Sequence, residues 1–258
     1  MSALHVHQWG PADARPLLVV HGVTNTGARY RRLAQEHLPE LRVLAPDLRG
    51  HGRSTWDPPW SLERHVADLL DTLDAVGVVR ADVLGHSFGG VIGLHLAATA
   101  PDRLGALVLL DPAGALEPAR AGREAEETRR DEGWASVDEA RAARLALRPA
   151  HSRDTVEEDL ATFLRQGADG RVRFAYSRAA ATTAWSEMAR PAPSLASFRG
   201  RVELVTALRA DYVSDGLRSA LRRDLGERLT ESSIDAGHAL FWDAPAESAS
   251  RVRQALAR

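Results

Sequence analysis

The sequence predicts an α/β fold, namely a doubly wound, mostly parallel sheet that one helical insertion interrupts. Short runs rich in valine and leucine alternate with helix-length amphipathic segments over most of the 258 residues. Short continuous apolar runs are typical of strands that a parallel sheet buries on both faces, and their alternation with helices is typical of doubly wound proteins. The runs expected to form strands are Pro16–Val20, Leu41–Ala45, Ala81–Leu84, Ala106–Leu110 and Val202–Thr206.

The clearest helix is expected over Ser61–Val76, where apolar residues recur at spacings of three and four. Gly77 follows it as the expected C-terminal cap, because glycine readily adopts the left-handed conformation with which helices often end.

Strand signals are lacking between about residues 114 and 198, where the pattern is helical. Two capping boxes, Ser136–Glu139 and Thr155–Glu158, each mark the beginning of a helix. Pro191 and Pro193 mark the return to the sheet. We therefore expect residues 114–198 to form a helical cap on a core made of residues 1–113 and 199–258.

The composition excludes several classes of protein. A net charge of −2 gives no electrostatic basis for nucleic-acid binding, no apolar run is long enough to span a membrane, and the first ten residues do not resemble a signal peptide. We expect a cytoplasmic protein, monomeric or homodimeric, that acts on a small molecule without a cofactor or metal ion. The chain lacks cysteine, which excludes thiolate chemistry. It also lacks lysine, so a catalytic serine would need histidine or a carboxylate as its base.

Ser87 is the candidate nucleophile. It lies in Gly85-His86-Ser87-Phe88-Gly89, directly after the expected strand Ala81–Leu84 and before a helical stretch over Gly90–Ala100. A G-x-S-x-G motif between a strand and a helix is typical of a nucleophile elbow, a sharp turn that exposes the serine hydroxyl. A tight turn with a helix-capping serine is the alternative, which the strand–turn–helix context makes less favourable.

Two histidines beyond that helix could serve as the base, His151 and His238. His151 falls in the helical insertion. His238 lies directly after a further strand, expected as the last of the sheet, so His238 is the predicted base. The acid that orients it should lie on a loop at the carboxyl end of the sheet. Asp211, after the strand Val202–Thr206, is the predicted acid; Asp111, directly after Ala106–Leu110, is the second choice and Asp215 the third.

An oxyanion hole needs two N–H donors, and the backbone amide of Phe88, next to the nucleophile, is the first. The second is expected from the loop after Pro16–Val20, where Gly22 allows a sharp turn and the amide of Val23 can face the serine.

The chain resembles the α/β-hydrolase superfamily, specifically its capped bacterial serine esterases. The similarity rests on five segments in family order: L-L-V-V-H-G at 17–22, P-D-L-R-G-H-G-R-S at 46–54, G-H-S-F-G at 85–89, L-R-A-D at 208–211 and G-H at 237–238. This resemblance implies a triad of Ser87, Asp211 and His238, with the amides of Val23 and Phe88 as the oxyanion hole.

With serine at the elbow, the resemblance implies hydrolysis of a carboxylic ester or lactone through an acyl-enzyme. Cleavage of a C–C bond, thioester hydrolysis and ligand binding without turnover are the alternatives. Aromatic residues of the insertion and of nearby loops should line an apolar pocket for a medium-sized substrate. The candidates for that pocket are Trp60, Trp134, Trp185 and Met188.

Overall fold

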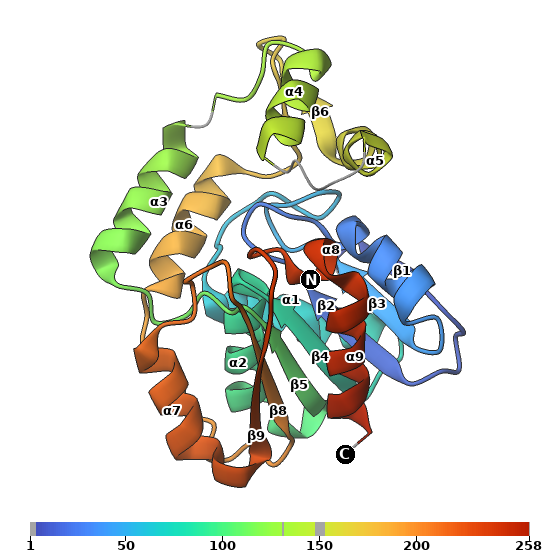
Figure 1. Ribbon diagram of the computed structural model, residues 1–258, viewed down its shortest axis with the longest axis vertical. Helices are drawn as coiled ribbons and strands as arrows, with labels where there is room; N and C mark the ends of the chain where they lie inside the picture. Colours follow the sequence, from blue (N-terminus) through green and yellow to red (C-terminus); the bar gives the residue numbers. More distant parts are fainter. Residues whose placement is uncertain (1–3, 131, 148–152, 258) are drawn as a thin grey trace.

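A computed structural model describes residues 4–130, 132–147 and 153–257 of the chain (Figure 1). In this part of the chain, seven strands form one sheet in the order β1-β3-β2-β4-β5-β8-β9. Strand β1 is antiparallel to β3, and the other neighbouring strands are parallel. This confirms the predicted mostly parallel α/β sheet. The strands are β1 (Val6–Trp9), β2 (Pro16–Val20), β3 (Arg42–Pro46), β4 (Ala81–His86), β5 (Leu104–Leu110), β8 (Val202–Ala207) and β9 (Leu229–Ile234).

Each face of the sheet has its own hydrophobic core, because successive side chains of a strand point to opposite faces. Leu18 and Val20 of β2 pack in the core that also contains the buried residues of helices α1 (Leu62–Ala75), α2 (Phe88–Thr99) and α7 (Asp215–Leu225). Leu17 and Val19 pack in the other core, with α9 (Pro245–Leu256). Figure 1 shows α9 in front of the strands and α2 behind them. The sheet is therefore covered on both faces, as its continuous apolar strands require.

Helix α1 closely matches the predicted Ser61–Val76. Ser61 is its N-cap, and its hydroxyl oxygen accepts a 3.3 Å hydrogen bond from the Arg64 N–H. Gly77 follows the helix with a φ of +71°, the left-handed conformation expected of it.

The short strand β1 was not predicted. It is an edge strand of four residues that is mostly half-buried, so it lacks the continuous apolar run that revealed the central strands.

The chain between β5 and β8 forms a mainly helical layer beyond the carboxyl ends of the strands (Figure 1). Helices α3 and α6 lie side by side, and α4, α5 and a small hairpin form a second group above the sheet. The hairpin was not expected from the sequence, since its strands have three residues each. The elements are α3 (Pro118–Arg130), α4 (Val137–Leu147), α5 (Arg153–Phe163), β6 (Leu164–Gln166), β7 (Val172–Phe174) and α6 (Arg178–Met188).

The two capping boxes predicted for this region had different outcomes. Helix α4 begins after Ser136, whose hydroxyl accepts a hydrogen bond of 3.1 Å from the Glu139 N–H, as predicted. The second box, with Thr155 as N-cap, predicts a helix that begins at Val156, but residues of α5 are helical from Arg153, three residues earlier. Among the helices that the structure describes, none is both long enough and apolar enough to cross a membrane.

Candidate active site

Ser87 occupies a strained turn between β4 and α2. Its φ of 55° and ψ of −120° place it in a region that non-glycine residues rarely adopt. Strand β5 and the loop that follows it hold this conformation: the Ser87 N–H donates to the Leu110 carbonyl (3.1 Å), and the Ala113 N–H donates to the Ser87 carbonyl (3.3 Å). The turn thus has the geometry of a nucleophile elbow, in which backbone strain presents the serine hydroxyl above the sheet.

Glycine is needed on both sides of Ser87 because backbones approach closely there. A Cβ atom on Gly89 would lie 2.0 Å from the Val20 carbonyl oxygen, and one on Gly85 would lie 2.5 Å from the Gly89 oxygen. Both distances are far below van der Waals contact, so the two glycines allow α2 to start directly against β2 and β4.

His238 is held by a buried carboxylate. Its Nδ1 lies 2.6 Å from Oδ2 of Asp111, and the other oxygen of Asp111 accepts a 3.0 Å hydrogen bond from the Ala207 N–H. Asp111 is 1% exposed, has a positive φ of 45°, and donates its N–H to the Val205 carbonyl (2.8 Å). Strand β8 therefore fixes the carboxylate in the position where it contacts the imidazole.

Two further rings surround the His238 imidazole. The Tyr212 ring lies 4.1 Å from it between centroids and the His86 ring 4.7 Å from it. Nε2 of His86 donates to the His238 carbonyl oxygen over 2.8 Å. These contacts fix the loop after β9, on which His238 lies.

The structure does not bring Asp211, the predicted acid, to His238. The Asp211 side chain is 86% exposed, and its Oδ1 accepts a 2.8 Å hydrogen bond from Arg120. Asp111, the second choice, takes the position instead, because β5 is the direct neighbour of β4 in the sheet. The other base considered, His151, lies outside the described residues.

The loop after β2 passes next to Ser87. A Cβ atom on Gly22 would lie 3.2 Å from the Ser87 Cβ. The Leu48 N–H donates to Nε2 of His21 (2.9 Å), so the proton of this imidazole is on Nδ1, which donates to the Gly22 carbonyl (2.8 Å). In a trans peptide the carbonyl and the following N–H point in opposite directions. The Val23 N–H is therefore turned away from His21.

Burial, with a further contribution from His51, lowers the pKa of His21 to about 3. The imidazole is therefore neutral near pH 7 and can keep the accepting Nε2 that orients this loop.

Ser87 and His238 line one cavity of about 170 Å³ beyond the carboxyl end of the sheet. A larger hollow of about 380 Å³ lies at the opposite end, among Arg15, Arg80 and Asp82, and its lining contains neither serine nor histidine. The lining of the first cavity comprises Gly22, Val23, Thr24, Asn25, Arg29, His86, Ser87, Arg144, Trp185, Tyr212, His238, Ala239, Phe241 and Trp242.

Of the four pocket residues predicted, only Trp185 lines this cavity. Met188 is fully buried in the core, and Trp134 packs edge-on against Phe174, with ring centroids 5.2 Å apart. The indole nitrogen of Trp60 faces Gly50 instead of the cavity.

Sequence reasoning missed Tyr212, Phe241 and Trp242 as lining residues. Their positions next to Asp211 or shortly after His238 in the sequence were the available signal.

Two arginines form part of the cavity wall and share one carboxylate. Arg29 binds Oδ1 of Asp159 over 2.5 Å through Nε, and Arg144 binds Oδ2 over 2.8 Å. Asp159 is buried, and the Arg29 guanidinium also lies 5.1 Å from the centroid of the Trp242 ring. The wall therefore combines aromatic surface with fixed guanidinium groups.

Comparisons with known proteins agree with the observed fold. A family model described as "alpha/beta hydrolase fold" matches residues 15–245. A lipase of Mycobacterium tuberculosis, LipV, is 39% identical over 256 residues, which cover 98% of this chain and 97% of that protein.

Solved structures of low sequence identity share the fold. A hydrolase of Pseudomonas aeruginosa has a TM-score of 0.78 at 22% identity and covers 98% of this chain and 94% of its own. An E-2-(acetamidomethylene)succinate hydrolase has a TM-score of 0.83 at 18% identity, with coverages of 99% and 95%.

Proposed function

The chain belongs to the α/β-hydrolase fold family, and we propose that it is a serine hydrolase that cleaves carboxylic esters through an acyl-enzyme on Ser87. The observation that carries the proposal is the contact between His238 and the buried Asp111 at the wall of the cavity that contains Ser87. The similarity to a mycobacterial lipase along nearly the whole chain supports ester substrates.

In the proposed mechanism, the Asp111 carboxylate accepts a hydrogen bond from the Nδ1–H of His238, which keeps the proton on Nδ1 and leaves Nε2 free to act as the base. Nε2 takes the proton of the Ser87 hydroxyl as Oγ attacks the ester carbonyl. The N–H groups of Val23 and Phe88 stabilise the resulting oxyanion. His238 then returns its proton to the leaving alkoxide, and the bond to the alcohol breaks.

The second half of the reaction releases the acid. His238 accepts a proton from a water molecule, which attacks the acyl carbonyl. When the tetrahedral intermediate collapses, His238 returns the proton to Ser87 Oγ and the carboxylic acid leaves. The orientation of the Val23 peptide by His21 supports the role of Val23, since its N–H is turned away from His21.

We propose residues 114–198 as the cap that shapes the substrate site. Arg144 of α4 and Trp185 of α6 line the same cavity as Ser87, which supports this role. Together with Tyr212 and Phe241, Trp185 gives the cavity an aromatic surface suited to a medium-sized apolar acyl or alcohol group.

The test is labelling with a fluorophosphonate, followed by mapping of the adduct by mass spectrometry. The proposal predicts stoichiometric labelling at Ser87 that Ser87→Ala abolishes and that Asp111→Asn and His238→Ala slow strongly. Slow labelling of a folded wild-type protein, or labelling that does not depend on His238, would contradict an activated serine and favour a ligand-binding protein.

A substrate panel then defines the specificity. Esters of acetate, butyrate, octanoate and benzoate, together with simple lactones, are compared by kcat/KM. We expect the butyrate or benzoate ester to be hydrolysed faster than the acetate. A clear preference for acetate would contradict the proposed apolar site, and a preference for lactones would identify a lactonase.

A further inference from the structure

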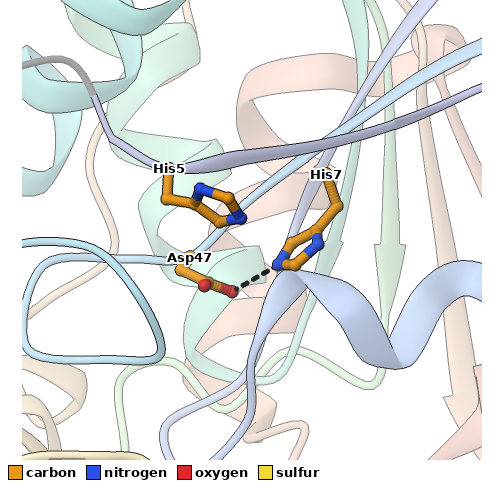
Figure 2. A group of neighbouring side chains, drawn as sticks. All are labelled: His5, His7 and Asp47. Atoms are coloured by element: carbon orange, nitrogen blue, oxygen red, sulfur yellow. Dashed lines mark hydrogen bonds and ion pairs between the residues drawn. The ribbon is translucent and has the colours of Figure 1, made fainter. Parts of the chain in front are cut away.

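Three side chains that could bind a metal ion meet outside the lining of the Ser87 cavity, at the edge of the sheet that β1 forms. His5 and His7 are two residues apart in the extended chain and so project to the same side. Asp47 directly follows β3, the strand that pairs with β1. Figure 2 shows the three side chains facing one another, and one ligand atom of each lies within 4.8 Å of the others.

We propose that His5, His7 and Asp47 form a binding site for a divalent transition-metal ion such as Zn²⁺. Two imidazole nitrogens and one carboxylate oxygen are a donor set that this class of ion prefers. No metal site was expected from the sequence, because forty residues separate His7 from Asp47 in the chain.

The separation of two of the three ligand atoms suits a tetrahedral ion. Nε2 of His7 and Oδ1 of Asp47 are 3.2 Å apart, and two ligands at about 2.0–2.1 Å from a tetrahedral ion are separated by about 3.3 Å. The ion would take the place of the proton between these two atoms, with the remaining imidazole proton of His7 on Nδ1. The ring nitrogen of His5 lies within 4.8 Å of the other two ligand atoms, so the His5 side chain must move closer to supply the third ligand, and water can occupy the fourth position.

Backbone groups already hold the carboxylate in place. The Gly27 N–H donates to Oδ1 of Asp47 and the Arg53 N–H to Oδ2, both over 2.9 Å. These hydrogen bonds orient the ligand before an ion arrives, as outer-shell hydrogen bonds do in metal sites.

Hydrogen bonds also connect the backbone of His5 to the loop that follows β3. The His5 N–H donates to the Ser54 hydroxyl and the Asp47 N–H donates to the His5 carbonyl, both over 2.9 Å. A bound ion would add a further link between β1 and the loop that follows β3, so it would stabilise the folded chain.

An ion can reach the cluster from solvent. The His7 side chain is 19% exposed and His5 is also only half-buried. The exposed Arg53 guanidinium interacts electrostatically with His5, so its positive charge opposes the binding of a cation.

The experiment measures thermal unfolding of the full chain after chelator treatment, with and without Zn²⁺, and the visible absorption of added Co²⁺. Saturating Zn²⁺ is expected to raise Tm by about 5 °C, and Co²⁺ should give the d–d bands of a four- or five-coordinate site. His5→Gln and His7→Gln should abolish both signals. Arg53→Gln should lower the Kd for Zn²⁺ several-fold.

Two control variants locate the ion. His95→Gln removes a histidine of α2 outside the cluster, and His238→Gln removes the candidate base; both should keep the wild-type response. Signals that are absent from the wild type, that survive in His5→Gln and His7→Gln, or that disappear in His238→Gln would overturn the proposal. Ester hydrolysis is not the readout, so the outcome is independent of the proposed catalytic function.

Discussion

Nδ1 of His238 and Oδ2 of Asp111 lie 2.6 Å apart, although the two residues are separated by more than a hundred residues in the chain. The strand order explains why these two side chains are in contact. Strand β5 lies beside β4, so the residue directly after β5 stands next to Ser87, and the loop after β9 brings the imidazole across β8. The Ala207 N–H of β8 holds the second oxygen of Asp111, so the carboxylate cannot turn away.

Replacing Asp111 by asparagine should lower kcat for an ester substrate on the order of 10³–10⁴-fold. The amide side chain favours the wrong imidazole tautomer and cannot stabilise the imidazolium that forms. Asp211→Asn is the matched control, and its kcat should stay within about twofold because the exposed carboxylate pairs with Arg120 and does not contact His238. Steady-state kinetics of the two variants decide between the two aspartates, and equal losses would contradict the assignment to Asp111.

Sequence reasoning identified what depends on local pattern. The apolar runs revealed the central strands, and the glycines around Ser87 revealed the elbow. Which aspartate reaches His238 depends on which strands are neighbours, and no single segment encodes this, so Asp211 in the loop after Val202–Thr206 was favoured over Asp111. The pocket depends on how the helices after β5 pack, and for this reason Met188 is in the core whereas Tyr212 lines the cavity.

Gly89→Ala should prevent α2 from packing against β2 and destabilise the protein by about 3 kcal/mol or more. The added Cβ would lie 2.0 Å from the Val20 carbonyl oxygen and 2.7 Å from that of His21, and backbone atoms cannot give way cheaply. Urea unfolding measures the effect.

Gly216→Ala, in the first turn of α7, is the control for that substitution. Its Cβ would meet only the Ser214 hydroxyl oxygen at 3.9 Å, and alanine favours a helix over glycine by up to about 1 kcal/mol. We expect its unfolding midpoint to be unchanged or higher. Similar losses in both variants would show that the close approach at Gly89 does not limit stability.

Tyr212→Leu should lower kcat/KM for an aromatic ester by about 2–10-fold, the effect of losing one aromatic contact. The Tyr212 ring lies 4.1 Å from the His238 ring and 4.4 Å from the Arg120 guanidinium carbon. Because Tyr212 lines the cavity, we expect part of the loss in KM and part in kcat, through a less well positioned imidazole.

Arg120→Gln separates the effect of Tyr212 on substrate binding from its effect on the position of His238. Arg120 contacts the Tyr212 ring but is not among the residues that line the cavity. It should leave KM near the wild-type value and change kcat by less than Tyr212→Leu does. If both variants kept wild-type kinetics for acetate and benzoate esters alike, Tyr212 would have no role in positioning His238.

The protein should lose stability as the pH falls below about 6.5, because buried histidines must take up protons when the chain unfolds. Burial, with a further contribution from His51, lowers the pKa of His65 to about 3, and His21 has a similarly low value. Between pH 3 and 6.5 the unfolded chain binds these protons and the folded chain does not. Stability therefore rises with pH in this window, by up to about 1.4 kcal/mol per pH unit for each histidine.

His65→Leu removes one of these groups and should make the free energy of unfolding less dependent on pH between 4 and 6. Leu69→Val, a substitution in the core on the same helix, is the control: it should lower stability at every pH and leave the pH dependence unchanged. Urea unfolding of the three proteins at pH 4, 5, 6 and 7.5 makes the comparison. A His65→Leu profile parallel to that of the wild type would mean that His65 takes up no proton on unfolding, contrary to its buried position beside Phe88.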